Sequence, residues 1–248
     1  MRVLITGASV GFGAEIAKKF SANDHEVILL ARRKERLLAL QKELGKNCVG
    51  IIAQDINDFE KLRANLEDFA ESIDVLINNA GLALGIEPAY ECELADWERM
   101  IETNVLSLIR LTHFLLPHMI KRQRGHIINI GSIAGSYPYP GSNVYGATKA
   151  FLKQFSLNLR ADLLGKNIRV SNIEPGLSGG SEFSLVRFKG EEKRAYELYE
   201  GAHPLMPEDI AEAVFWCASL PEHVNINRIE LMPTTQAPAG LSVHKDKG

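Results

Sequence analysis

The sequence alternates between strand-length apolar runs and helical segments, and this alternation constrains the fold more than any other feature. The apolar, β-branched runs lie at residues 3–6, 26–30, 49–53, 75–78, 126–130 and 168–173, and a last one is expected at 229–232. Segments of helical periodicity separate them, at residues 15–20, 34–44, 58–69, 96–118, 143–164 and 208–220. This pattern is typical of βαβ units. We therefore predict an α/β fold, a doubly wound Rossmann-type three-layer sandwich with a mainly parallel seven-stranded sheet.

The length of the chain allows either one domain with a full core or two small domains. The chain has 248 residues, 46% of them hydrophobic, and lacks a low-complexity linker, so we expect a single domain over residues 1–248. Two regions depart from the alternation. Residues 177–207 are polar and lack a strand, as expected of a substrate lid. The tail, residues 233–248, is too polar for a core, and we expect it to wrap a neighbouring subunit or to be loose.

Composition argues against several classes of protein. The formal net charge is −3 and the basic residues are scattered, which argues against a nucleic-acid partner. No apolar run approaches the roughly 18 residues of a membrane-spanning helix, and glycines stand where a signal peptide has its apolar part, so we expect a cytoplasmic protein without a membrane partner. The cysteines are few and widely spaced, which argues against a disulfide framework and a zinc site, and no metal is expected.

A glycine-rich turn directly follows the first expected strand and opens a helix. Backbone amides at the start of a helix can face a pyrophosphate, and residues without a Cβ let it approach closely. The spacing is G-x-x-x-G-x-G. We therefore expect dinucleotide contacts from Gly7, Ser9, Val10, Gly11, Phe12 and Gly13.

The end of the second strand predicts which dinucleotide binds. An acidic residue there would bind the ribose 2′-hydroxyl of NAD, whereas this chain has Arg32 and Arg33. Guanidinium groups form charge-assisted hydrogen bonds with phosphate, and basic residues without an anion would be unfavourable at the positive start of a helix. We predict NADP as the cofactor, with Ser9 assisting the two arginines.

The carboxyl ends of the next two strands carry further candidates for cofactor contacts. Asp55 and Ile56 follow the third strand, and Asn79 and Gly81 follow the fourth. Open α/β sheets bind ligands at these ends, so we expect contacts with the adenine and the ribose. Ordinary turns are the alternative, because Asn, Asp and Gly are common turn residues.

Tyr145 and Lys149 lie one helical turn apart in the segment YGATK. Residues four apart share a helix face. A positive charge held close to a phenol lowers its pKa from the ordinary value near about 10. Tyr145 is therefore a candidate for proton transfer, and an ordinary surface pair is the alternative.

Several motifs occur together in the order and spacing of one family. They are TGASVGFG, NNAG, Asn104, Ser132, YGATK and Pro175-Gly176. On these residues the chain resembles the short-chain dehydrogenase/reductase family over nearly its whole length. It is most similar to the bacterial NADP-dependent 3-hydroxy acid dehydrogenases, through segments that include GLALGIEPA and EFSLVRFKG. The resemblance implies an enzyme that interconverts small 3-hydroxy acids (L-allo-threonine, serine, 3-hydroxypropionate) and 3-oxo acids or malonic semialdehyde.

The resemblance also implies catalytic roles. Tyr145 matches the acid/base, and Lys149 matches the residue that lowers the pKa of that tyrosine and holds the nicotinamide ribose. Ser132 matches the donor that orients the substrate oxygen. Asn104 matches a residue whose backbone carbonyl, exposed by a local kink in a helix, holds a relay water.

The Pro175-Gly176 turn is expected at the cofactor by the same resemblance. Family members commonly have a Thr five positions after this proline, whereas this chain has Gly180. We expect Ser181, or the backbone of the Gly179–Gly180 pair, to contact the nicotinamide carboxamide instead.

Arg187, in the expected lid, is the candidate for binding the substrate carboxylate, because a guanidinium can bind a carboxylate in bidentate fashion. Phe188 beside it could shield the closed site. Glu87 and Glu182 are weaker candidates for the amino group of an amino acid substrate. A surface arginine on a polar loop is the alternative for Arg187.

Two other functions remain open. One is a carbonyl reductase that acts on neutral ketones or on carrier-bound 3-oxoacyl groups. The other is a non-catalytic NADP-sensing protein, against which the four expected catalytic residues argue together. The family resemblance and the apolar series Phe151, Phe155 and Leu159 on the helix of Tyr145 predict a homotetramer.

Overall fold

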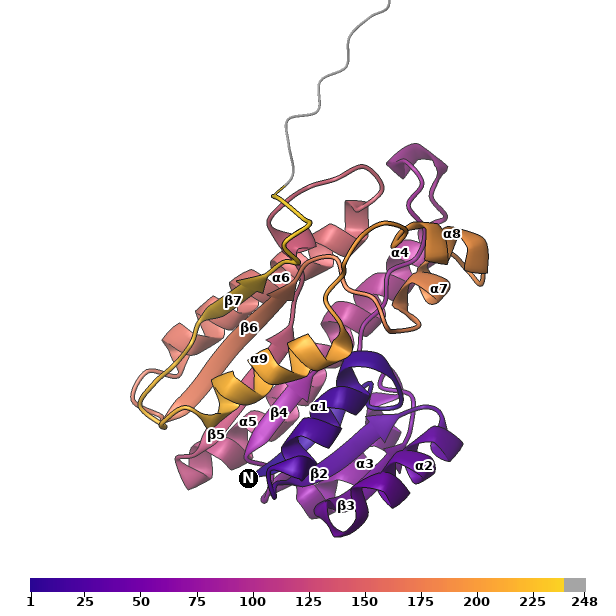
Figure 1. Cartoon of the computed structure of the whole chain (residues 1–248). Coiled ribbons are helices and arrows are strands. Elements are labelled where there is room, and N and C mark those ends of the chain that lie inside the picture. The colour runs from indigo at the N-terminus through magenta and orange to yellow at the C-terminus, as the bar shows by residue number, and fades with distance from the viewer. Residues whose placement is uncertain (239–248) are drawn as a thin grey trace, which may run out of the picture.

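Seven strands in the described part of the chain form one parallel sheet (Figure 1). The computed structural model of the chain describes residues 1–238. Within them the strands are β1 (Arg2–Thr6), β2 (Glu26–Ala31), β3 (Cys48–Ala53), β4 (Val75–Asn78), β5 (Gly125–Ile130), β6 (Ile168–Pro175) and β7 (Arg228–Leu231). Their order is β3-β2-β1-β4-β5-β6-β7 and every neighbouring pair is parallel. The expected α/β sandwich is confirmed, and the sheet is parallel throughout.

Helices cover both faces of the sheet and form two buried cores. One layer consists of α1 (Gly11–Ala22), α2 (Lys34–Leu44) and α9 (Pro207–Ser219), and the other of α3 (Phe59–Ala70), α5 (Ser107–Arg122) and α6 (Asn143–Asp162). Successive strand residues point to opposite faces. Val3 and Ile5 of β1 therefore pack with the first layer and Leu4 with the second. Both faces of the sheet are buried, which explains why the strands are apolar without alternation.

The helix expected at residues 96–118 is not continuous. It consists of α4 (Leu94–Ile101), a π-helical turn (Glu102–Leu106) and α5. A π turn has one extra residue in its hydrogen-bonded ring and often marks a functional position. The turn contains Asn104, so the local kink expected at this residue is present.

Residues 177–207 form two short helices beside α4, α7 (Phe183–Arg187) and α8 (Glu192–Glu197) (Figure 1). An isolated β-bridge between Ser178 and Leu205 joins the two ends of the segment 177–207. The first part of the expected tail also lies on this segment, because Leu177 N donates to Gln236 Oε1 over 2.7 Å. The rest of that tail, residues 239–248, lies outside the described residues.

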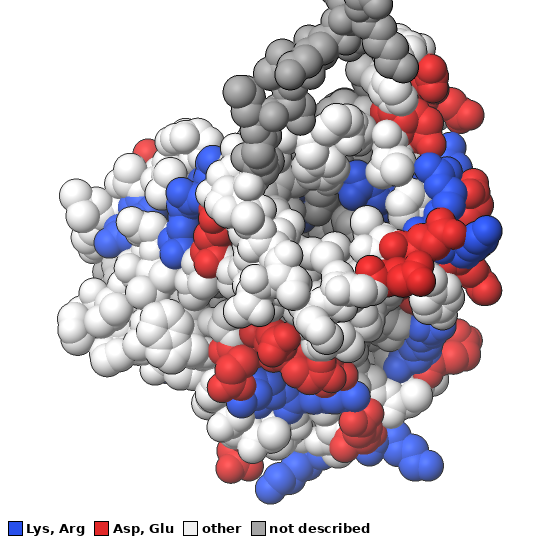
Figure 2. Space-filling model, turned by 45° about the horizontal axis from the view of Figure 1, so that its top comes forward, with Lys and Arg blue, Asp and Glu red and all other residues white. Residues whose placement is uncertain are grey.

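The surface carries both signs of charge in close alternation. Figure 2 shows acidic and basic side chains next to one another on the face in view. Ion pairs such as that of Lys189 with Asp96, at 2.8 Å, join opposite charges on the surface. Among residues 1–238, no helix combines the length and the apolar character needed to cross a membrane. Of the cysteines, Cys48 and Cys217 are buried and Cys92 is partly exposed.

Candidate active site

The glycine-rich turn leads directly from β1 into α1. Gly7 and Gly11 have φ values of +67° and +55°, which favour glycine. Val10, the residue before α1, does not cap the helix with its side chain. The first turn of α1 carries no acidic residue. The amides at the start of α1 therefore lack a side-chain partner at this cap, which suits an anion.

The segment after β4 is clamped onto this turn. Asn79 Nδ2 donates to Thr6 O at 2.8 Å, and the Asn79 and Ala80 amides both donate to Thr6 Oγ1 at 2.9 Å. A Cβ on Gly13 would lie 2.7 Å from Asn79 Nδ2, so this position requires glycine. The side chain of Asn79 thus holds the turn in shape, while its predicted contact with the cofactor remains a prediction.

A cluster of charged groups lies beside the turn at the end of β2. Arg33 Nη2 donates to Ser9 Oγ at 3.2 Å, so the expected pair of Arg33 and Ser9 is present. Arg33 and Arg36 also bind the two carboxylate oxygens of Glu182, at 2.7 and 2.8 Å. Arg32 is exposed, and its side chain forms no hydrogen bond or ion pair within the described part of the chain.

Two expectations change at this cluster. Arg36 was missed by sequence reasoning, although its position three residues after Arg33 on α2 could have indicated a shared face. Glu182 is engaged by two guanidinium groups, so it is not free to bind an amino group. Burial alone would raise its pKa, but the hydrogen bonds from Arg33 and Arg36 outweigh burial and hold the pKa below its ordinary value.

Other expected cofactor residues lie at the same edge of the sheet. Asp55 accepts a hydrogen bond from the Asn57 amide at 2.9 Å and lies 3.6 Å from Arg99, so it forms a turn close to α4. Ile56 packs partly against the core. A Cβ on Gly81 would lie 3.6 Å from Lys149 Nζ, which places the backbone of Gly81 next to this lysine.

The Pro175-Gly176 turn ends β6, and Ser181 lies against the glycine-rich turn. A Cβ on Gly11 would be 2.7 Å from Ser181 Cβ. Gly180 has a φ of +67°, and its backbone approaches Pro207. The structure therefore brings Ser181 next to Gly11, while its predicted contact with the nicotinamide carboxamide remains a prediction.

Tyr145 and Lys149 are both buried on α6. Lys149 Nζ lies 5.8 Å from the centre of the Tyr145 ring and donates to Ile130 O at 2.7 Å. Burial lowers the pKa of Lys149 to about 8. Ser132 Oγ accepts from the Ala134 amide at 3.1 Å and faces Tyr145.

The pKa of Tyr145 differs from expectation. Burial raises it above the ordinary value, while a hydrogen bond with Ser132 and the charge of Arg187 lower it. Lys149 is not among these causes, since the lysine itself is desolvated and directs its ammonium group to Ile130 O. A lowering of the Tyr145 pKa by Lys149 stays a prediction.

Asn104 lies on the π turn with its side chain fully engaged. Its Oδ1 accepts from Leu82 N at 2.9 Å, and its Nδ2 donates to Leu82 O at 2.8 Å and to Thr148 Oγ1 at 3.1 Å. These bonds tie the turn to the segment after β4 and to α6. The side chain therefore positions three elements of the site, and the role expected of the backbone carbonyl stays a prediction.

Arg187 is the last residue of α7 in the lid, and it is buried next to Tyr145. Its Cζ lies 5.8 Å from the ring centre of Tyr145 and 5.5 Å from that of Tyr139. Nε donates to Gly85 O at 3.2 Å, while Nη2 is buried without a partner in the described structure. Within residues 1–238 no carboxylate pairs with this guanidinium, which is unusual for a buried arginine.

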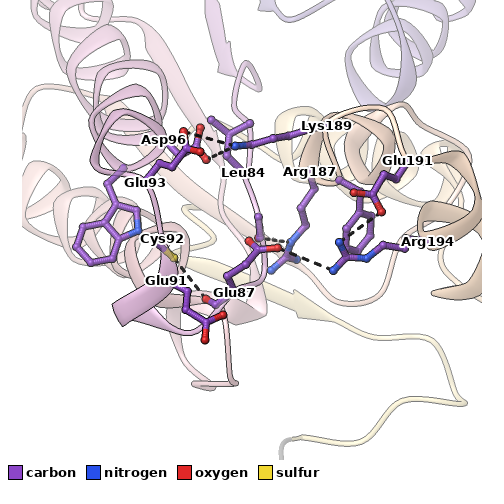
Figure 3. Close-up of a pocket in the computed structure, with 13 residues that line it drawn as sticks. Leu84, Glu87, Glu91, Cys92, Glu93, Asp96, Arg187, Lys189, Glu191 and Arg194 are labelled. Carbon is purple, nitrogen blue, oxygen red and sulfur yellow. Dashed lines mark hydrogen bonds and ion pairs between the residues drawn. The ribbon is translucent and has the colours of Figure 1, made fainter.

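Arg187 also lines a crevice of about 240 Å³ between the lid and the segment from Leu84 to Trp97. Figure 3 shows its guanidinium pointing toward the segment that carries Glu87, with Arg194 beside it. The crevice carries both signs of charge, with acidic residues at Glu87, Glu91, Glu93, Asp96 and Glu191. Phe188 is buried and Arg194 stacks on it, with Cζ 4.8 Å from the ring centre.

The residues present fit an NADP molecule. The uncapped start of α1 and its glycines suit the pyrophosphate, and Arg33 with Ser9 suits a 2′-phosphate. Gly81, Tyr145 and Lys149 lie together where a nicotinamide ribose would reach the acid/base.

Comparisons with known proteins agree with this architecture. The short chain dehydrogenase family model matches residues 1–184. The "NADP-dependent 3-hydroxy acid dehydrogenase YdfG" of Salmonella typhimurium is 58% identical over 99% of this chain and 100% of its own length. The "Serine 3-dehydrogenase" of Agrobacterium fabrum is 50% identical over 98% of each chain.

A solved structure is similar over the same range. It is described as the closed form of serine dehydrogenase complexed with NADP+, is 53% identical, and has a TM-score of 0.94 over 99% of this chain and 100% of that chain. The fold, the ordered motifs and these matches together place the protein: the chain belongs to the short-chain dehydrogenase family.

Proposed function

We propose that the chain is an NADP-dependent oxidoreductase that interconverts small 3-hydroxy acids, such as L-allo-threonine, serine and 3-hydroxypropionate, with 3-oxo acids or malonic semialdehyde. The observation that carries the substrate class is Arg187. Its guanidinium is buried beside the acid/base and has an unpaired Nη2. A substrate carboxylate would satisfy this group, and a neutral ketone would leave it unpaired.

The cofactor supplies the chemistry of hydride transfer at its nicotinamide ring. Tyr145 takes the proton of the substrate hydroxyl during oxidation and returns it during reduction. Ser132 donates to the substrate oxygen and holds it near the tyrosine. Lys149 binds the ribose hydroxyls, and the carbonyl of Asn104 holds a relay water to Lys149.

The lid completes the site in this proposal. Residues 177–207 close over the substrate, with Arg187 binding the carboxylate and Phe188 excluding water. Glu87 lines the crevice next to Arg187 and is the remaining candidate for the amino group of an amino acid substrate. A relative described in its closed form supports a lid that moves.

A carrier-bound 3-oxoacyl substrate is supported less well. An acidic carrier protein would need a basic surface at the entrance. The crevice beside Arg187 instead carries five carboxylates with its cations. Small free acids need only the single cation that is already buried.

We further propose a cytoplasmic homotetramer. Phe151 and Phe155 stack with ring centres 5.6 Å apart on α6, and Phe151 is exposed. Ile101 and Leu164 are exposed apolar residues as well. A helix that exposes rings of this size favours association with another subunit.

The test is reduction of the cofactor during oxidation of four substrates: L-allo-threonine, L-serine, 3-hydroxypropionate and a neutral secondary alcohol, each with NADP and with NAD. Turnover of the acids with NADP, and little with the neutral alcohol, is the expected result. Equal activity with both dinucleotides would contradict the cofactor assignment. Activity on the neutral alcohol alone would support a carbonyl reductase.

A further inference from the structure

Glu182 binds the arginines that face the predicted 2′-phosphate site. Its Oε2 accepts from Arg33 at 2.7 Å and its Oε1 lies 2.8 Å from Arg36. Arg33 also reaches Ser9 in the glycine-rich turn, at 3.2 Å. The carboxylate therefore lies in the same cluster of donors that a 2′-phosphate would use.

Glu182 takes up donors of both Arg33 and Arg36. A phosphate monoester carries about −1.5 to −2 at neutral pH, so a phosphate beside Glu182 would experience like-charge repulsion. A 2′-phosphate that binds these two arginines therefore competes with the carboxylate of Glu182.

We infer that the carboxylate of Glu182 is an internal stand-in for the 2′-phosphate of NADP, because it binds the same arginines. When NADP binds, its 2′-phosphate displaces Glu182 from Arg33 and Arg36 and thereby releases the start of the lid helix α7. The inference rests on the proposed use of NADP. It makes Glu182 a residue that sets cofactor affinity, together with Arg36, and it links the cofactor site to the lid.

The link runs through a single short helix. Glu182 immediately precedes α7, and its backbone carbonyl accepts the amide of Val186 at 2.9 Å. The next residue, Phe183, has its ring centre 5.7 Å from that of Tyr145. The last residue of α7 is Arg187, so displacement of Glu182 acts on the element that carries the proposed carboxylate group.

NAD would not act in this way, because a ribose 2′-hydroxyl cannot replace a carboxylate between two guanidinium groups. The lid would then keep its contact with Arg33 and Arg36. Selectivity for NADP would thus have two parts, direct binding of the phosphate and release of α7.

The first test uses 2′-AMP and 5′-AMP as probes, titrated by calorimetry into the full chain. Glu182→Gln keeps the size of the side chain and removes its charge, so 2′-AMP should bind about three- to tenfold more tightly. The affinity for 5′-AMP should not change. Glu197→Gln is the matched control, because Glu197 lies on α8 of the same lid and pairs only with exposed Lys193, at 3.8 Å.

Arg36→Ala tests whether the effect passes through the arginines. It should weaken 2′-AMP binding, and Glu182→Gln should then give a much smaller gain in the Arg36→Ala background. A gain of unchanged size in that background would overturn the role of Arg36.

The second readout is amide hydrogen exchange over residues 183–187. In the wild-type protein, 2′-AMP should increase exchange in this segment and 5′-AMP should not. In Glu182→Gln the segment should already exchange faster, and 2′-AMP should add little. Unchanged exchange in the wild-type protein, or weaker 2′-AMP binding by Glu182→Gln, would overturn the inference.

The two proposals fail in different ways. In the first case, 2′-AMP binds no more tightly than 5′-AMP, both to the wild-type protein and to Glu182→Gln. Both the use of NADP and the stand-in role are then wrong. If 2′-AMP binds selectively through Arg33 but Glu182→Gln brings no gain, only the stand-in role is wrong.

Discussion

The guanidinium of Arg187 lies over the ring of Tyr145, with Cζ 5.8 Å from the ring centre. One residue comes from the lid and the other from the rigid helix α6, so the lid brings a positive charge to the acid/base. This charge lowers the pKa of Tyr145, which burial raises. Under the proposed function, the position of the lid would therefore affect both substrate binding and proton transfer.

Replacing Arg187 by alanine should reduce kcat/KM for a 3-hydroxy acid by roughly 10- to 150-fold. This range corresponds to about 1.5–3 kcal/mol for a hydrogen bond to a charged group. The loss for a neutral secondary alcohol should be clearly smaller. Arg194→Ala is the control, since Arg194 stacks on Phe188 of the same lid without reaching Tyr145. Equal losses for acid and alcohol would show that Arg187 does not select carboxylates.

The same variant should change the pH dependence of alcohol oxidation. Oxidation needs a deprotonated Tyr145 to accept the proton, and Arg187 favours this form. Without that charge the pKa of Tyr145 rises, so the acidic limb of the kcat profile should move upward by up to about one pH unit. Arg187→Lys should move it less. A neutral alcohol is the substrate for this measurement, and superimposable profiles would contradict the electrostatic role.

The regular part of the structure could be predicted because it depends on local patterns. The apolar runs give the strands, and their lack of alternation follows from burial on both faces of a parallel sheet. The relative position of Tyr145 and Lys149 is fixed by one turn of α6. Asn79 and Ser132 follow strands at one edge of the sheet, and Tyr145 lies on a helix that begins there, so the pattern could place these residues near one another.

What could not be predicted depends on contacts between distant parts of the chain. Arg33 and Glu182 are 149 residues apart and pair only because the lid folds back on the glycine-rich turn. The pKa of Tyr145 depends on burial by the lid, which the segment YGATK does not encode. The π turn at Asn104 is stabilised by Leu82 and Thr148, neither of which lies near it in sequence.

The two arginines at the end of β2 should differ in their contribution to cofactor binding. Arg33 contacts Ser9 and lies beside the turn, whereas Arg32 is exposed. Arg33→Ala should weaken NADP binding by roughly 10- to 150-fold, as expected for loss of a charge-assisted hydrogen bond, and leave NAD binding unchanged. Arg32→Ala should have a smaller effect. Titration of both dinucleotides by fluorescence measures the four affinities, and a larger loss with Arg32→Ala would reverse the assignment.

Asn104→Ala should lower the free energy of unfolding by about 2–4 kcal/mol. The variant removes three hydrogen bonds of a buried side chain and leaves the Leu82 amide and carbonyl without partners. Chemical denaturation measures the loss. Asn158→Ala is the control on exposed α6 surface, where a change within about 0.5 kcal/mol is expected. A loss no larger than that of the control would mean that Asn104 does not hold the three elements together.

Lys149 should decrease the stability of the folded protein at neutral pH. Its pKa falls from 10.5 to about 8 on folding, because burial disfavours the charged form. Below about pH 8 both states carry the proton and the folded state bears the full cost, about 3 kcal/mol. Above this pH the folded lysine is neutral while the unfolded one stays charged, so the cost declines toward pH 10.5.

Lys149→Met removes this titration and should abolish catalysis. The wild-type protein should therefore gain stability relative to Lys149→Met as the pH rises, by about 2 kcal/mol between pH 6.5 and 9.5. The hydrogen bond to Ile130 O affects the absolute difference but contributes little to its slope. Urea denaturation at several pH values gives the difference, and Lys153→Met on the same helix should show no such slope. A difference that is constant over this range would mean that the pKa of Lys149 is not lowered by folding.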